Sequence, residues 1–253
     1  MRSWLRFVAI ETLARLQGPP PRTGIRFLAG HSLAGRDIAR FDDLLRSLKK
    51  NWTFINFGDA VALRRSGKVD GRYVCFSFDD GLWDVAETII PCLERHHVNA
   101  CVFVLTDLLD GDLSTRQAIL QREIRASPCQ LTIDWSGVLR LRDAGAIIGC
   151  HGSSHRNLSA LPLQEAIDDV LLAKSRLEDR LGHSCDYFAW PFGSSRHCST
   201  QLAAQVRPHF LEIFSTIRNP TASDERCGCI HRDNFEPWWS PRHVEYFLRR
   251  RRE

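Results

Sequence analysis

Short apolar runs alternate with amphipathic segments along most of the 253-residue chain, and no other feature constrains the fold as strongly. The apolar runs indicate buried strands and include residues 25–31, 74–78, 99–105 and 146–151. The segments between them place apolar residues at helical spacing, as in residues 37–51 and 161–182. Strands that alternate with helices favour a parallel sheet with helical crossovers. The sequence therefore predicts an α/β fold, either a barrel or a doubly wound sheet.

This pattern begins after residue 23. Residues 18–24, GPPPRTG, hold three consecutive prolines, which end any preceding helix. Before that break, apolar side chains fall on one helical face and arginines on the other: Trp4, Leu5, Val8, Leu13 and Leu16, against Arg2, Arg6 and Arg15. We expect an amphipathic helix and a Pro-rich break in residues 1–23, and one domain in residues 24–253. The helix would either pack on the domain or lie on a membrane surface.

Basic residues gather at both ends, although the net charge is only +4. They suit solvated helix ends, an anionic lipid surface or a phosphorylated substrate. No nucleic-acid-binding motif accompanies them, so we expect no nucleic-acid partner. The N-terminal segment does not resemble a secretory signal, and no run of about 18 apolar residues could span a membrane. Several of the nine cysteines lie inside apolar runs, which indicates reduced thiols. These features predict a cytoplasmic protein with peripheral contact at the inner membrane face.

Polar or turn-forming residues stand where four of the predicted strands end. They are Asp79-Asp80-Gly81, His151 with His155 four residues later, Pro191-Phe192-Gly193, and His231-Arg232. In both candidate folds the carboxyl ends of parallel strands meet at one edge, where chemistry gathers. We therefore expect these residues to form one site.

Two histidines and one carboxylate are a common ligand set for a divalent metal with open positions for water and substrate. His151 and His155 are four residues apart, so one helical turn or a tight loop could aim both at one ion. The two aspartates could instead cap a helix, but a cap needs only one of them. A second carboxylate at the end of a buried strand needs a cation or hydrogen bonds. We expect one aspartate to bind the metal and the other to take a proton from the water that the metal acidifies.

Four motifs resemble the polysaccharide deacetylases of carbohydrate esterase family four, the nodulation-type deacetylase domain. FSFDDG is similar to the TFDDG motif, and HGSSH to the H[ST]xxH motif with Gly152 in the Ser/Thr position. NACVFV is similar to the ATFFV strand, and FAWPFG to the F[SA]YPYG of the branch that includes the poly-N-acetylglucosamine deacetylases. The resemblance covers residues 24–235 in the right order.

The resemblance implies a distorted (β/α) barrel of about seven parallel strands, with residues 24–253 as the catalytic domain. It implies that Asp80, His151 and His155 bind a divalent metal, zinc first, with cobalt, manganese, nickel or iron as alternatives. Asp79 would be the catalytic base. Trp190, Pro191 and Phe192 would line the substrate groove together with His31, and the Phe192 backbone N–H would be an oxyanion donor.

Two departures from the family pattern bear on the catalytic groups. The usual arginine is absent before FAWPFG, so Arg232 in CIHRDNF is expected to orient the base. The late Leu-x-His motif is not clear, so His231 is the expected acid for the departing amine, with His31 in AGHSL as its rival.

The expected function is the metal-dependent removal of an N-acetyl group from an amino sugar or glycan. A lipid-linked or nucleotide-linked sugar is one form that we consider for this substrate. A non-sugar amide or formamide is an alternative substrate for the same site. A non-catalytic carbohydrate-binding relic is the alternative from another class, which the complete Asp79, Asp80, His151 and His155 set disfavours.

Overall fold

The computed structural model describes residues 10–14, 18, 20–124, 131–218 and 225–249. Its strands are β1 Gly24–Gly30, β2 Thr53–Phe54, β3 Arg72–Phe78, β4 Ala100–Val104, β5 Ile147–Cys150, β6 Tyr187–Ala189, β7 Glu212–Ser215, β8 Ile230–His231 and β9 Asp233–Asn234. Its α-helices are α2 Ile38–Leu48, α3 Phe57–Ser66, α4 Ile90–Arg95, α5 Thr106–Asp110, α6 Leu113–Ala118, α7 Trp135–Asp143, α8 Leu163–Leu181, α9 Thr200–Val206 and α11 Pro241–Leu248.

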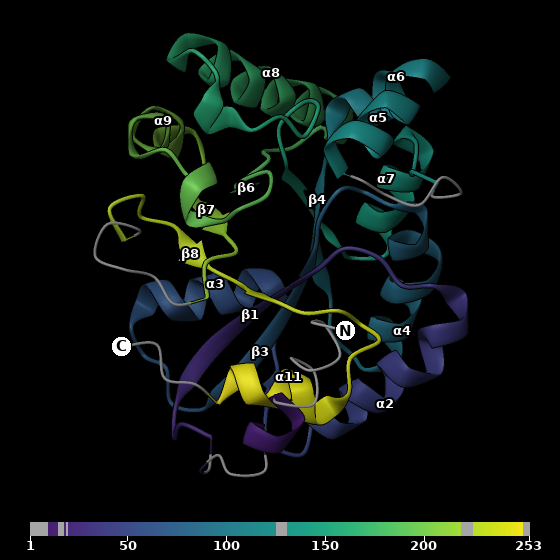
Figure 1. Ribbon diagram of the computed structural model, residues 1–253, viewed down its shortest axis with the longest axis vertical. Helices are drawn as coiled ribbons and strands as arrows, with labels where there is room; N and C mark the ends of the chain where they lie inside the picture. The colour runs from purple at the N-terminus through teal and green to yellow at the C-terminus, as the bar shows by residue number, and fades with distance from the viewer. Residues whose placement is uncertain (1–9, 15–17, 19, 125–130, 219–224, 250–253) are drawn as a thin grey trace.

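The strands form a nearly closed, all-parallel barrel (Figure 1). The hydrogen-bonded order is β8-β7-β6-β5-β4-β3-β1-β9, with β2 beside β3. One short stretch, residues 230–234, joins the two ends of this order: β8 pairs with β7, and β9 pairs with β1. Counting that stretch once, the described strands make a ring of seven, which confirms the predicted distorted (β/α) barrel.

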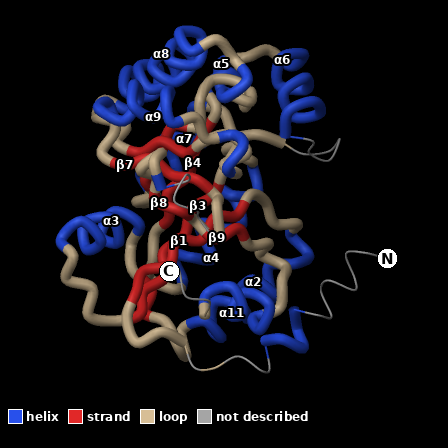
Figure 2. Tube along the Cα trace, turned by 60° about the vertical axis from the view of Figure 1, so that its left-hand side comes forward, coloured by secondary structure: helices blue, strands red, loops and turns tan. Residues whose placement is uncertain are grey.

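Alternate residues of each strand face the barrel interior or the surrounding helices. Phe27, Cys75, Phe103 and Phe214 belong to the interior cluster, where Phe57 from α3 packs against the aromatic rings. The residues between them, such as Phe76, pack outward in a larger cluster under α2, α4 and the other helices. Figure 2 shows the strands at the centre and the helices around them. This alternation decides which strand-end side chains can reach the site.

The N-terminal prediction lies largely outside the described residues. Residues 10–14 are helical, Ile10 is buried, and Glu11 accepts a hydrogen bond from Ser240 at the start of α11. This short part therefore packs on the domain. Within the described residues, no helix combines the length and apolar character needed to cross a membrane.

Candidate active site

Asp79 continues the interior face of β3, two residues beyond Ser77 and four beyond Cys75. Its carboxylate accepts two hydrogen bonds from Arg232, from Nη1 to Oδ1 at 2.7 Å and from Nη2 to Oδ2 at 2.9 Å. Both residues are buried, at 2% and 0% exposure. The structure thus brings Arg232 to the place that the sequence predicted, against the proposed base.

Arg232 lies in the stretch that closes the barrel, and several groups fix it there. Its Nη1 donates to Ser77 Oγ at 3.0 Å, and Ser77 Oγ in turn donates to the Leu28 carbonyl at 2.8 Å. The guanidinium lies 4.9 Å from the ring centroid of Phe103. Barrel closure and the orientation of Asp79 therefore depend on the same short segment.

The charge of Asp79 follows from these contacts. Burial raises the pKa of the Asp79 carboxyl, but the positive charges of Arg232 and His151 outweigh burial. The pKa therefore falls below its ordinary value, to about 2. Asp79 is therefore ionised at neutral pH.

Asp80 reaches the site through an unusual backbone conformation. Even-numbered residues of β3 face the outer helices, so a continued strand would carry Asp80 away from the interior. Asp80 has a φ of 74° and Gly81 a φ of 66°, both left-handed, and the chain turns there. A side chain at Gly81 would crowd Val104, since a Cβ would lie 3.1 Å from Val104 Cγ1. The glycine of the FDDG sequence is thus required by this turn.

Asp80, His151 and His155 form a buried trio from β3 and the end of β5, with 2%, 1% and 6% exposure. Asp80 Oδ1 lies 3.6 Å from His151 Nε2 and 3.5 Å from His155 Nε2. These distances are too long for good hydrogen bonds. Tetrahedral ligands of one zinc ion lie about 3.3 Å apart for bonds near 2.05 Å. The trio therefore has nearly the spacing of metal ligands.

The orientation of both imidazoles suits a cation. His151 Nδ1 lies 2.8 Å from the Ala189 carbonyl oxygen, which can only accept, so Nδ1 donates there and Nε2 is the nitrogen that faces Asp80. Burial lowers the pKa of His155 to about 4, so this ring is neutral at neutral pH. Asp80 Oδ1 is buried and accepts no hydrogen bond from a described residue. A buried carboxylate oxygen that faces the Nε2 atoms of two imidazoles fits a divalent cation.

A loop, not a helix, places His155. Gly152 has a φ of 82°, and a Cβ there would lie 2.9 Å from Asp169 Oδ1. Because Gly152 has no side chain, Asp169 of α8 can approach this loop. Its buried carboxylate accepts a hydrogen bond from Ser153 N at 2.9 Å and pairs with Arg156 at 3.0 Å. The sequence analysis missed Asp169, although an acid on the otherwise apolar inner face of α8 was a visible signal.

The Pro191-Phe192-Gly193 turn forms one wall beside the trio. Phe192 has a φ of 61°, is 39% exposed, and packs its ring 4.4 Å from that of His155. Pro191 is buried in the same turn. Trp190 does not share this position: it faces outward, packs on Phe188, and is 1% exposed. The structure thus places the Trp190 side chain, predicted to bind substrate, in the outer core, because strand alternation turns it away from this wall.

The two candidate acids lie on different sides of the barrel wall. His231 follows the interior residue Ile230 and precedes the interior Arg232, so its side chain faces outward. There His231 Nδ1 lies 2.6 Å from Ser215 Oγ, and Nε2 lies 3.5 Å from Glu225. The structure therefore places the His231 side chain on the outer side of the barrel wall, away from Asp79.

His31 is placed on the catalytic side. It directly follows Gly30 at the end of β1, and the Gly30 carbonyl accepts a hydrogen bond from Asp79 N at 3.0 Å. Burial, Arg232 and His151 have the larger effects on the pKa of Asp79, and the charge of His31 lowers it as well. The structure thus places His31, and not His231, near Asp79.

Comparison with known proteins agrees with this geometry. A family model described as polysaccharide deacetylase matches residues 66–209, more than half of the chain. The chain belongs to the polysaccharide deacetylase family. The match includes Asp79, Asp80, His151, His155 and Phe192 but ends before Arg232. The chain is therefore a hydrolase of the carbohydrate esterase family four type, acting on amide C–N bonds of acetylated sugars.

Solved structures share the barrel. The deacetylase PplD from Streptococcus pyogenes, in complex with acetate, has a TM-score of 0.68 and 16% identity over 90% of this chain and 99% of that one. IcaB from Ammonifex degensii has a TM-score of 0.67 and 17% identity, over 92% of this chain and 100% of that one. The BpsB deacetylase domain from Bordetella bronchiseptica has a TM-score of 0.65 and 17% identity, over 87% of this chain and 98% of that one. At these identities the likeness shows the fold. No curated protein matches the chain.

Proposed function

We propose that this chain removes N-acetyl groups from amino-sugar residues of a glycan, with Asp79 as the base and Asp80, His151 and His155 as ligands of a divalent metal. The observation that carries the proposal is the opposite surroundings of two adjacent carboxylates. Asp79 is neutralised by a guanidinium at 2.7 Å, whereas Asp80 faces two imidazoles at 3.5 and 3.6 Å. Of these two carboxylates, only Asp80 has no arginine or lysine partner among the described residues, which supports ligation there and proton transfer at Asp79.

A divalent ion held by the trio would acidify a coordinated water and polarise the acyl carbonyl. Asp79 needs such an acidified water, because a carboxylate with a low pKa is a weak base. The borderline donor set of two imidazoles and a carboxylate favours zinc, with cobalt, manganese, nickel and iron as alternatives. Arg232 donates a hydrogen bond to each Asp79 oxygen, which fixes the rotation of the carboxylate that takes the proton.

We assign the remaining roles to groups on the two sides of the trio. His31, beside Asp79, donates a proton to the nitrogen of the departing amine. The backbone N–H of Phe192 stabilises the negative charge on the acyl oxygen. The half-exposed Phe192 ring packs against the sugar, while its contact with His155 fixes the wall.

Acetyl is the proposed acyl group. The family name and the acetate bound to the similar PplD structure support this choice. A lipid or nucleotide link to the substrate finds no support in the described residues. A cytoplasmic location with contact at the inner membrane face stays a prediction.

The test is a mass-spectrometric screen of N-acetylated glycan oligomers and sugar nucleotides for the replacement of one acetyl group by hydrogen. The purified chain should give this loss, and Asp79→Asn should not, although it binds metal in the same amount. An Asp79→Asn variant that turns over at the original rate would refute the role of Asp79. A metal-loaded chain that deacetylates no N-acetylated sugar would refute the proposed substrate class.

A further inference from the structure

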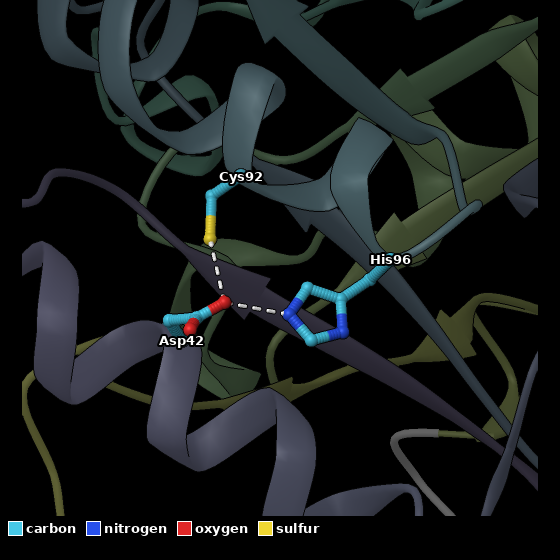
Figure 3. Close-up of side chains that lie close together, drawn as sticks. All are labelled: Asp42, Cys92 and His96. Atoms are coloured by element: carbon cyan, nitrogen blue, oxygen red, sulfur yellow. Dashed lines mark hydrogen bonds and ion pairs between the residues drawn. The ribbon is translucent and has the colours of Figure 1, made fainter.

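A second group of ligand-type side chains lies in the outer helical layer. Asp42 comes from α2, Cys92 from α4, and His96 directly follows α4. Figure 3 shows the Cys92 thiol and the His96 ring both pointing at one carboxylate oxygen of Asp42. Cys92 and His96 are four residues apart, so they project from one face of α4 toward α2. One atom from each residue lies within 4.8 Å of the others. No catalytic group belongs to this cluster.

The distances come close to those of a metal site. His96 Nε2 lies 2.7 Å from Asp42 Oδ1, and Cys92 Sγ lies 3.8 Å from the same oxygen. Around a tetrahedral zinc ion with ordinary bond lengths, these separations would be about 3.3 Å and about 3.6 Å. The sulfur is already near its place. The imidazole must move by about 0.6 Å, which a small rotation about its side-chain torsions supplies.

The arrangement does not suit a cysteine nucleophile. Asp42 Oδ1 is the common partner of the thiol and the ring, so the nearest group to Cys92 is an anion and not a base of the His type. Burial, chiefly, raises the pKa of Cys92 to about 11, so the thiol keeps its proton at neutral pH. A cation that displaces this proton would make the thiolate a ligand.

Nearby positive charges limit the affinity but leave the required oxygen free. Arg46 forms an ion pair with Asp42 through Oδ2, which leaves Oδ1 to face Cys92 and His96. Lys49 Nζ donates to the His96 carbonyl oxygen at 2.9 Å, and Arg95 lies on the same short helix. These cations oppose a dication, so the cluster should bind more weakly than the catalytic trio.

We propose that Asp42, Cys92 and His96 form a second divalent-cation site, selective for zinc and cobalt, that joins α2 to α4. Sulfur, imidazole and carboxylate donors suit zinc and disfavour magnesium and calcium, and water completes the coordination. On binding, the thiol proton and the proton between His96 Nε2 and Asp42 Oδ1 both leave to solvent, and the ring keeps a proton on Nδ1. Nε2 and Oδ1 then bind the ion in place of each other. The site holds the helices together and takes no part in turnover.

The test uses cobalt as the probe, because only a thiolate ligand gives a sulfur-to-cobalt charge-transfer absorption and the catalytic trio contains no cysteine. The full chain and an Asp80→Ala variant, each titrated with cobalt, should both show this absorption. Cys92→Ala should lose it together with one equivalent of bound cobalt, while Cys185→Ala, which removes another buried thiol, should keep both.

A second variant protects the test against misfolding of Cys92→Ala. His96→Ala keeps the thiol but removes the nitrogen ligand, and it should weaken cobalt binding at least 10-fold by the same absorption. Circular dichroism of each variant establishes that it is folded. Unchanged absorption and stoichiometry in folded Cys92→Ala, or no thiolate absorption in the full chain up to millimolar cobalt, would overturn the second site.

Discussion

The two clusters of potential ligands differ in how far their members have closed on one another. In the catalytic trio, Asp80 Oδ1 stays 3.5 and 3.6 Å from its imidazole neighbours. In the helical cluster, Asp42 Oδ1 and His96 Nε2 have closed to 2.7 Å. The first group keeps room for an ion between its members, whereas in the second group Asp42 and His96 form a hydrogen bond with each other.

Backbone conformation explains this difference. Asp80 and His155 both have left-handed φ values, 74° and 60°, held by the surrounding loops and the barrel. Such conformations persist only where the surroundings impose them. Asp42 lies in a regular helix, and Cys92 in another. Strained backbone therefore fixes Asp80 and His155, two of the proposed ligands, while ordinary helices leave the other cluster free to relax.

The largest effect should come from removing the shared oxygen of the catalytic trio. We expect Asp80→Ala to lose the catalytic metal and to lower kcat/KM by at least about 10³-fold, because the acidified water and the polarised carbonyl are lost together. Metal content by atomic absorption and deacetylation by mass spectrometry provide the measurements. Asp42→Ala is the matched control and should turn over at close to the normal rate. If Asp42→Ala were as inactive as Asp80→Ala, the division into catalytic and structural clusters would be wrong.

A smaller effect should follow from disturbing the base without touching the ligands. Arg232→Lys keeps the charge but removes the paired hydrogen bonds to Asp79 and the contact with Ser77. We expect a loss of about 10- to 100-fold in kcat at unchanged metal content, the range seen when groups that orient a metal site are altered. An equal loss of metal and activity would instead show that Arg232 supports the trio.

Strand alternation explains which site residues could be predicted from the sequence. Asp79, Asp80, His151 and Arg232 follow strands, and parallel strand ends meet at one edge. The outward position of His231 could also have been predicted, because adjacent residues of a strand face opposite sides and Arg232 was expected to face Asp79. The same rule applies to Trp190. The left-handed turn at Asp80 could not be derived from alternation, since it breaks that rule.

The barrel could be predicted, but its closure could not. Alternating strands and helices allowed either a barrel or an open sheet, and the family motifs decided between them. The closing stretch, residues 230–234, has only two paired residues on each side. So short a strand has no periodicity to detect. The contact of Asp42 with Cys92 and His96 also escapes prediction, because it depends on how two helices pack.

The smallest effect concerns the helical cluster without metal. We expect His96→Ala to lower the free energy of unfolding by about 1 kcal/mol, the usual worth of one partly buried hydrogen bond, and to leave kcat unchanged. His97→Asn is the matched control, because His97 is exposed, its left-handed φ of 56° suits asparagine, and no loss is expected.

The pH dependence of that loss identifies its partner. The hydrogen bond with His96, chiefly, lowers the pKa of Asp42 below its ordinary value of 3.8. A carboxyl whose pKa is lower in the folded state contributes stability above its unfolded pKa and loses it as the pH falls through the folded pKa. The stability difference between the original chain and His96→Ala, measured by urea unfolding in chelator, should therefore be full near pH 6 and shrink below about pH 4. A difference that stays constant into acid would assign the loss to the packing of the ring on Phe54 and not to Asp42.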